Sequence, residues 1–284
     1  MGYKYYKKMT GLVTKAVNLK SEMVNFSENI KTNKYNGKSV YVNYNGSALR
    51  IQMPKMSLPF GISKYVNPDK PEEIKYSLEM SFKDVNPVIL EQLHEIENKT
   101  LDFVEKNSKE LFKKQMSREV VAENYKSSIK YGEDENGDRD LKYAPRLKAK
   151  IYTEGANLRV DTFDSVKVDN KYQKIHINED NVDDIITKGS SCEAILSCSG
   201  IWVVGKTFGV SWVLSQLKIY KNENTLSGYA FQDDEEEEEE EENFDEEEPS
   251  NVVDSGTSDV EEEVEKLKIT EAPAKKTRRK KELF

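Results

Sequence analysis

The sequence is poor in the residues on which most metal and thiol chemistry depends. It contains only 2 cysteines, 2 histidines and 2 tryptophans among 284 residues. Cys192 and Cys198 are six positions apart in an apolar, strand-like run, which favours two core positions on one strand face over a disulfide or a metal pair. His94 falls in a predicted helix and His176 on a predicted strand, and neither has Cys or His neighbours at zinc-ligand spacing. We therefore expect no metal site, no cofactor and reducing surroundings.

Long hydrophobic runs are also missing. No window approaches eighteen consecutive apolar residues, which argues against a membrane span. The amino end, Met1 to Tyr6, lacks an apolar signal core, and Tyr6 stands where a myristoylation signal requires Ser or Thr. We expect a protein that is neither secreted nor bound to a membrane.

What the chain has in excess is acid, and it is concentrated near the carboxyl end. Asp233 and Asp234 precede eight consecutive glutamates, Glu235 to Glu242. Residues 233 to 284 contain 22 Asp and Glu against 8 Lys and Arg, a net charge of −14, whereas residues 1 to 232 contain 30 against 35, a net charge of +5. A cationic body that carries a tethered polyanion is typical of proteins that regulate the binding of a polyanionic partner.

Alternation and turn patterns predict a body that is mainly β. Strands at 39–44 and 48–53 flank Asn45-Gly46, a favoured hairpin turn. Further strands are expected at 74–82, 145–153, 158–163, 175–177, 192–199, 201–204 and 208–220. Between them, cap residues Asp84 and Asn86 and then Pro87 predict a long amphipathic helix that ends at about Lys114, followed by a shorter helix from Arg118 to about Ser127.

This order of elements favours a small barrel or sandwich with inserted helices over a parallel α/β sheet. We divide the chain into an amino-terminal extension (1–34), a folded domain (35–232) with a helical insertion at about 87–127, and a disordered acidic tail (233–284) that is too charged to pack.

One stretch matches a nucleotide-binding motif in spacing only. Residues Gly200 to Thr207 satisfy GxxxxGK[ST], but the four intervening residues are bulky and β-forming. A strand follows at 208–214, so no helix N-terminus would face a phosphate. We interpret Gly205-Lys206 as a hairpin turn. Because the carboxylates outside the tail are scattered as well, we expect no enzyme activity.

Basic and aromatic residues alternate along several predicted strands. Because residues two apart share a face, Arg146, Lys148, Lys150 and Tyr152 form one cationic stripe. Such a stripe tracks a phosphate backbone, while exposed rings stack on unpaired bases. The candidate nucleic-acid contacts are Tyr41, Tyr44, Arg50, Arg146, Lys148, Lys150, Tyr152, Arg159, Trp202, Lys206, Phe208 and Trp212. The alternative is a solvated sheet face with Trp202 and Trp212 in the core.

Two segments carry a resemblance to a known family. The segment from Ala194 to Tyr220, with Gly200-Ile201-Trp202 and Phe208-Gly209-Val210-Ser211-Trp212, resembles the closing strands of the phage T7-like single-stranded-DNA-binding proteins, in the branch found in large nucleocytoplasmic DNA viruses. The segment Tyr143 to Lys150 is similar to that branch's central strand. The resemblance covers about residues 35 to 232.

This resemblance implies an OB-fold-like barrel interrupted by a helix, which coats unpaired DNA during viral replication, recombination and repair. It also implies an acidic tail with an aromatic tip that occludes the DNA site, supports homodimer contacts and recruits replication partners such as polymerase, helicase or primase. The implied location is the host nucleus or a cytoplasmic viral replication site.

The tail departs from the family pattern in one respect. Its terminal aromatic, Phe284, follows a basic block at 275–281, whereas Phe244 is embedded in acid; the candidate partner-binding residues are Glu235, Glu242, Phe244 and Phe284. The basic block is open to three interpretations: a nuclear import signal, a DNA-contacting arm or a solubilising end.

Two other classes of function stay open at this point. An acidic-tailed chaperone for basic proteins such as histones would use the glutamate run as its binding element. A nuclease, or an NTPase acting through Lys206, is the third interpretation. Removal of the tail distinguishes a DNA-binding protein from a chaperone. It would raise DNA affinity in the former and abolish partner binding in the latter.

Overall fold

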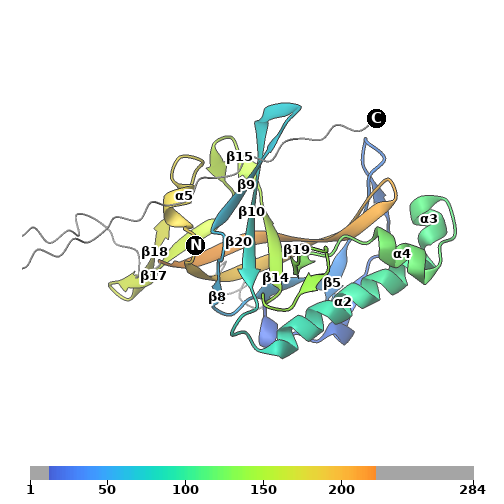
Figure 1. The fold of residues 1–284 in the computed structure, drawn as a ribbon, viewed down its shortest axis with the longest axis horizontal. Coiled ribbons are helices and arrows are strands. Elements are labelled where there is room, and N and C mark those ends of the chain that lie inside the picture. Colours follow the sequence, from blue (N-terminus) through green and yellow to red (C-terminus); the bar gives the residue numbers. More distant parts are fainter. Residues whose placement is uncertain (1–12, 222–284) are drawn as a thin grey trace, which may run out of the picture. The chain divides into compact units, whose positions relative to one another are not determined.

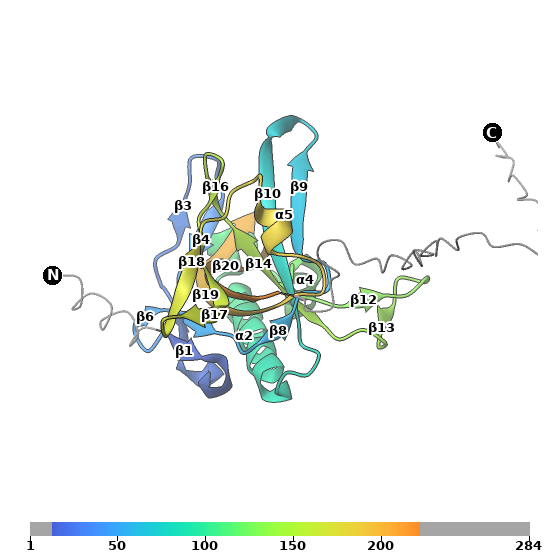
Figure 2. The same cartoon turned by 90° about the vertical axis from the view of Figure 1, so that its left-hand side faces the viewer.

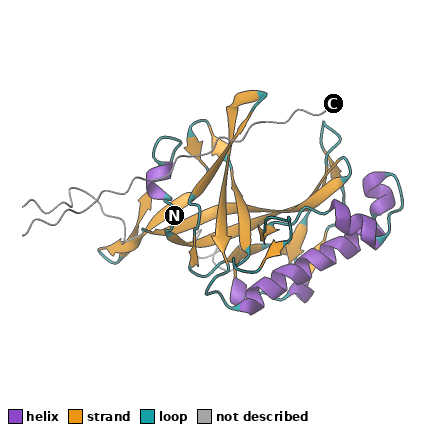
Figure 3. Ribbon diagram, viewed as in Figure 1, coloured by secondary structure: helices purple, strands orange, loops and turns teal. Residues whose placement is uncertain are grey.

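The structure is a computed structural model that describes residues 13–221, all of which belong to one compact unit. The candidate tail residues Glu235, Glu242, Phe244 and Phe284 and the basic block at 275–281 lie outside the described residues. The fold is mostly β with few helices, as expected. In Figure 3 the strands form the bulk of this part of the chain.

The strands are β1 (Thr14–Lys15), β2 (Val24–Phe26), β3 (Lys31–Thr32), β4 (Lys38–Val40), β5 (Val42–Tyr44), β6 (Ser47–Ala48), β7 (Arg50–Gln52), β8 (Met56–Ser57), β9 (Ile62–Asn67), β10 (Lys70–Ser81), β11 (Ile129–Lys130), β12 (Gly132–Glu133), β13 (Arg139–Asp140), β14 (Arg146–Ile151), β15 (Thr153–Glu154), β16 (Asn157–Leu158), β17 (Asp161–Val168), β18 (Lys171–Ile175), β19 (Ser191–Val204) and β20 (Thr207–Tyr220). The α-helices are α2 (Pro87–Lys106), α3 (Ser108–Phe112), α4 (Arg118–Asn124) and α5 (Val182–Ile185), and two 3₁₀ turns are η2 (Ala16–Asn18) and η3 (Ser21–Met23).

Five strands close a circuit of pairings. β19 pairs with β8, β8 with β10, β10 with β14, β14 with β20, and β20 with β19 again. β19 and β20 are the two longest strands, and β10 and β14 cross them in Figure 1. Residues 14–32, which precede the predicted domain, also pair with the body: β1 pairs with β7, β2 with β5 and β3 with β4.

Alternation along the central strands decides which side chains enter the core. On β14, Leu147, Ala149 and Ile151 are buried, whereas Lys148 and Lys150 are exposed. The buried side chains face a single hydrophobic core that also receives side chains from β10, β19, β20 and α2. Burial of this apolar surface is the main source of stability, and on β14 it leaves the opposite face exposed.

α2, α3 and α4 lie together along one side of the strands, whereas α5 lies apart from them near β18 (Figures 1 and 2). α2 begins as predicted, because Pro87 occupies its first turn and the Asn86 side chain accepts a hydrogen bond from the Val88 amide at 3.0 Å. The predicted end at Lys114 is wrong. The helix stops at Lys106, because Asn107 Nδ2 donates to the Phe103 carbonyl at 2.7 Å in a non-helical cap conformation, and α3 starts anew.

The predicted hairpin at 39–53 is confirmed at its turn and in the adjoining antiparallel pairs of β5 with β6, but not along the rest of its strands. Asn45 and Gly46 have φ values of 47° and 73°, as such a turn requires. The strand before the turn is broken at Tyr41, so that β4 pairs with β19 while β5 pairs with β2. The two parts of the predicted strand, β4 and β5, therefore differ in the strands with which they pair, which the local sequence pattern does not reveal.

Two other expectations are confirmed by the structure. Cys192 and Cys198 are free and buried, and burial raises the pKa of each thiol to about 12. Gly205 and Lys206 form the turn between β19 and β20, and a strand rather than a helix follows. None of the helices in residues 13–221 combines the length and apolar character that crossing a membrane requires.

Candidate nucleic-acid interface

A basic groove lies on the outward face of β9, β10 and β14. We define the basic groove by five lining residues: Tyr65, Lys75, Lys148, Lys150 and Tyr152. Its volume is about 480 Å³. The strand register brings these residues together, because Tyr65 on β9 pairs with Lys75 on β10, and the next outward position of β10 pairs with Lys150 on β14. Three lysines and two half-exposed tyrosines therefore share one surface.

The positive charge of the groove is only partly neutralised. Glu79 accepts a hydrogen bond from Arg146 Nε at 2.9 Å, and its other carboxylate oxygen is 3.9 Å from Lys148 Nζ. Within residues 13–221, neither Lys75 nor Lys150 forms an ion pair at 4 Å or less. Although Lys150 as a whole is exposed, its ammonium group is partly desolvated against Ser211, which lowers its pKa, and the charges of Lys75 and Lys148 lower it further. A bound anion would relieve this repulsion.

Trp202 extends the groove across the neighbouring strands. It pairs in register with Gly209 on β20, and a Cβ atom at Gly209 would lie 3.1 Å from the indole Cζ2 and only 2.4 Å from the Lys126 carbonyl oxygen. The missing side chain thus lets the half-buried indole pack close against the strand. Lys150 Nζ donates to Ser211 Oγ at 2.8 Å and lies 5.9 Å from the centre of the Trp202 ring. The indole and the lysines therefore belong to one continuous surface.

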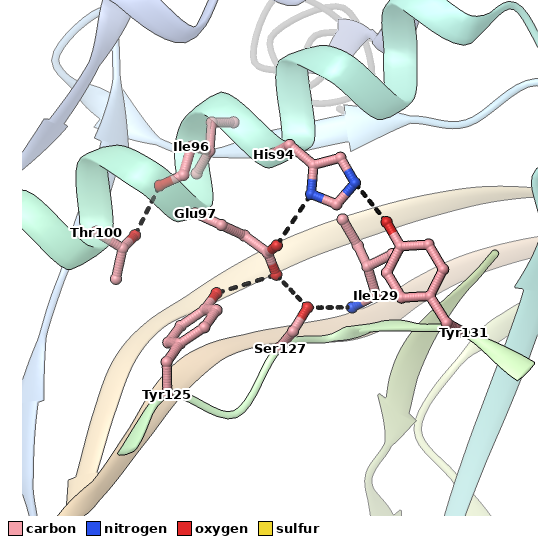
Figure 4. A network of polar contacts seen from close by, with 8 residues as sticks. All are labelled: His94, Ile96, Glu97, Thr100, Tyr125, Ser127, Ile129 and Tyr131. Atoms are coloured by element: carbon pink, nitrogen blue, oxygen red, sulfur yellow. Dashed lines mark hydrogen bonds and ion pairs between the residues drawn. The ribbon is translucent and has the colours of Figure 1, made fainter. Parts of the chain in front are cut away.

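A polar network links α2 to the segment of residues 125–131 (Figure 4). Glu97 Oε1 accepts hydrogen bonds from Tyr125 Oη at 3.0 Å and from Ser127 Oγ at 2.5 Å. The other carboxylate oxygen is 3.3 Å from His94 Nδ1, and His94 Nε2 is 2.7 Å from Tyr131 Oη. Burial raises the pKa of Tyr125, which keeps its hydroxyl a donor to the carboxylate.

The hydrogen bonds to Glu97 hold residues 125–127, whose backbone lies beside Gly209, the register partner of Trp202. Lys126 lies between the two residues that donate to Glu97, and its amide donates to the Phe208 carbonyl at 2.8 Å. Its carbonyl oxygen is the atom that a Cβ at Gly209 would meet. α2 thereby fixes the backbone that bounds the Trp202 position.

Replacement of Glu97 by Gln is expected to lower the free energy of unfolding by about 1 kcal/mol, because hydrogen bonds to a charged acceptor are stronger than those to a neutral amide. Urea unfolding followed by circular dichroism measures this difference. Glu91→Gln, at an exposed position of the same helix, is the matched control and should change stability by less than about 0.5 kcal/mol. Equal stability of the two variants would contradict the supporting role of the network.

The structure divides the residues predicted from the sequence into three groups. Lys148, Lys150 and Tyr152 line the basic groove, and Trp202 adjoins it. Arg146 lies on the same strand but is paired with Glu79, with its guanidinium 5.1 Å from the centre of the Phe60 ring. The remaining predicted residues lie elsewhere.

Two predicted contacts belong to the core. Phe208 is 0% and Trp212 3% exposed, because both alternate onto the inward face of β20. Phe208 packs against Tyr125 with ring centres 5.4 Å apart. Neither ring presents a surface on which a base can stack, so the predicted contact role of these two residues is corrected to a core role.

The other predicted residues lie outside the basic groove. Tyr44 packs half-buried against the core, and Arg50 is half-buried on β7 beside β19. Tyr41 is 49% exposed and accepts a hydrogen bond from Lys31 Nζ at 2.8 Å. Lys206 is exposed in the β19–β20 turn, and exposed Arg159 lies 3.8 Å from Glu154.

Two groove residues were missing from the sequence prediction. Lys75 alternates with buried residues in a strand that was predicted, so the signal for its outward position was present. Tyr65 carries no such signal, because no residue of β9 is buried and the strand becomes part of the groove only through its pairing with β10.

A family model described as "Family of unknown function (DUF5871)" matches residues 73–233, more than half of the chain. The chain belongs to this family. The part that matches DUF5871 includes Lys75, Lys148, Lys150, Tyr152 and Trp202, whereas Tyr65 precedes it. Most of the surface described above therefore lies within the DUF5871 region. No curated protein matches the chain.

Among solved structures, this DUF5871 chain is similar to single-stranded DNA-binding protein from bacteriophage Enc34. For that protein in complex with single-stranded DNA, the identity is 16% and the TM-score 0.37, with 71% of this chain and 100% of the other covered. For a form of the phage protein with a C-terminal truncation, the identity is 17% and the TM-score 0.38, with 70% and 99% covered.

Proposed function

We propose that the protein binds single-stranded DNA along the basic groove and Trp202. The observation that carries this proposal is the clustering of three lysines, Lys75, Lys148 and Lys150, with aromatic side chains on one sheet face. Lysine ammonium groups neutralise phosphates without reading sequence, and aromatic rings stack on any exposed base. Binding to unpaired strands without strong sequence preference follows from these two interactions, and no residue is assigned a catalytic step.

We further propose that the body is an OB-fold-like barrel of the kind implied by the resemblance to the T7-like proteins of large nucleocytoplasmic DNA viruses. The closed circuit of five paired strands supports this interpretation. In that setting the protein coats unpaired DNA in viral replication, recombination and repair, either in the host nucleus or at a cytoplasmic replication site.

The acidic tail supplies the regulatory part of the proposal. A tail of net charge −14 competes with DNA for the cationic body and is released when DNA binds. The released tail then recruits replication proteins such as polymerase, helicase or primase, and supports homodimer contacts. Glu235, Glu242, Phe244 and Phe284 are the residues to which we assign these contacts.

Tryptophan fluorescence tests the proposed interface directly. Trp202 adjoins the groove while Trp212 is buried, so oligo-dT should quench the emission of Trp202 and leave that of Trp212 nearly unchanged. The measurement uses two variants, Trp212→Phe and Trp202→Phe, each with one remaining tryptophan. Quenching should persist in the first and disappear in the second. If oligo-dT quenched only the Trp202→Phe variant, in which Trp212 is the remaining tryptophan, the proposed interface would be wrong.

A second candidate function is favoured by the glutamate run alone. In an acidic-tailed chaperone, residues 235–242 would bind basic proteins such as histones, and the body would serve as a carrier. The unneutralised lysines of the groove favour DNA binding, because a chaperone for basic proteins gains nothing from a cationic surface.

A further inference from the structure

A second hollow lies on the outward face of the long strands, apart from the basic groove. We call it the glutamine pocket and define it by Gln52, Phe163, Tyr172, Ile195 and Gln216. Its volume is about 490 Å³. Its floor is formed by β7, β19 and β20, and the β17–β18 hairpin supplies its two aromatic rings. No residue of this pocket was among the contacts predicted from the sequence.

The strand register arranges two amide groups around an apolar floor. Ile195 on β19 pairs with Gln52 on one side and with Gln216 on the other. Register partners point to the same face, so the two glutamines flank the isoleucine. Within residues 13–221, neither glutamine side chain makes a hydrogen bond, so four donor and acceptor groups are open to a ligand at the two edges of the floor.

Aromatic and charged groups complete the pocket. Phe163 pairs in register with Lys218, and Lys218 Nζ lies 5.0 Å from the centre of the Tyr172 ring. Lys218 is neutralised by Glu193, whose carboxylate oxygen is 2.8 Å away. Burial acts to raise the pKa of Glu193, but the hydrogen bonds from Lys218 and from Tyr220 outweigh it and lower the pKa. The pair therefore stays ionised and contributes no net charge.

Positive charge without an acidic partner among the described residues is present at the pocket, because Lys167 Nζ lies 4.9 Å from the centre of the Tyr172 ring and Lys171 is also unpaired. Lys171 lines it at the start of β18, is exposed, and makes no ion pair within the described residues. Rings, amides with open hydrogen bonds and a cation are the groups that a nucleotide requires: stacking surfaces and hydrogen bonds for the base, and a counter-charge for the phosphate.

We propose that the glutamine pocket holds one unpaired base of a DNA strand that continues from the basic groove. This inference rests on the proposed function. Ser211, which accepts the hydrogen bond from Lys150, is buried beneath that side chain, and the half-buried Gln216 lies five residues further along β20. At the rise of a β-strand, this separation is about 17 Å. A DNA strand that occupies both the basic groove and the glutamine pocket must be longer than one that fills the groove alone.

The test compares two lengths of oligo-dT on the full-length protein, about 5 and about 16 nucleotides, which span the usual footprints of OB-type domains. The double variant Gln52→Leu and Gln216→Leu removes both amides and keeps similar volume. It should weaken binding of the long strand about fivefold, because two hydrogen bonds are lost, and leave the short strand unchanged. Gln115→Leu, at an exposed position beyond α3, is the control and should change neither affinity.

Photocrosslinking gives a readout that does not depend on the stability of the variant. Long oligonucleotides with 4-thiothymidine should crosslink, in the unaltered protein, to peptides that contain Ile195 or Gln216. Normal DNA binding with no crosslink at these peptides, or an affinity of the double variant for the long strand equal to that of the unaltered protein, would overturn the inference. Failure of the unaltered protein to bind either length would instead overturn the proposed function, so the two failures are distinguishable.

Discussion

Replacement of Lys75, Lys148 and Lys150 together by Gln is expected to weaken binding to single-stranded DNA about a hundredfold at about 0.1 M salt. Each phosphate contact on a single strand contributes about 0.7 to the slope of log affinity against log salt, which is roughly fivefold in affinity at that salt concentration. Three contacts multiply to about a hundredfold. The three lysines were chosen because all of them line the groove, and neither Lys75 nor Lys150 has an acidic partner among the described residues.

The salt dependence separates this effect from a general loss of structure. The variant should show a slope shallower by about 2, while urea unfolding remains cooperative. A matched control removes the same charge from the helical side with Lys106→Gln, Lys109→Gln and Lys114→Gln, at exposed positions of α2, α3 and the turn that follows. If the control weakens binding as much as the groove variant, net charge rather than the groove controls affinity, and the proposed interface is wrong.

Removal of residues 233–284 is expected to raise affinity for single-stranded DNA about tenfold at low salt. A tethered segment acts at an effective concentration on the order of 1 mM, and weak polyanion binding has dissociation constants of about 0.1 mM. A tail with these properties occupies the groove most of the time and reduces DNA affinity by about that ratio. Titration of fluorescent oligo-dT at fixed salt measures the difference between the full-length and shortened proteins.

A full-length control distinguishes charge from length. Replacement of the 14 acids in residues 233–248 by Gln and Asn should raise affinity nearly as much as removal of the whole tail. Unchanged or weaker DNA binding by the shortened protein would refute tail competition. If the shortened protein loses binding to histones while its DNA affinity is unchanged, the chaperone interpretation replaces tail competition.

Much of the secondary structure was predictable because its causes are local. Asn86 and Pro87 start α2, Asn45-Gly46 forms a turn, and the apolar residues of 208–220 form the strand after Gly205-Lys206, whereas the predicted break at Gly200 is absent because 191–204 form the single strand β19. Each of these depends on side chains within a few residues of one another. The break in the first hairpin at Tyr41 was not predictable, because it follows from which distant strands β4 and β5 join.

The sequence alone determined the charge division of the chain, the alternation of Lys148 and Lys150 with buried residues, and the absence of a phosphate loop at Gly205-Lys206. The tertiary structure alone decided which rings meet those lysines. Trp202 and Trp212 have similar local surroundings, yet one faces outward beside Lys150 and the other is buried. Tyr65 and Lys75 join the same groove through strand register, a property of pairs of strands distant in sequence that no single strand's pattern contains.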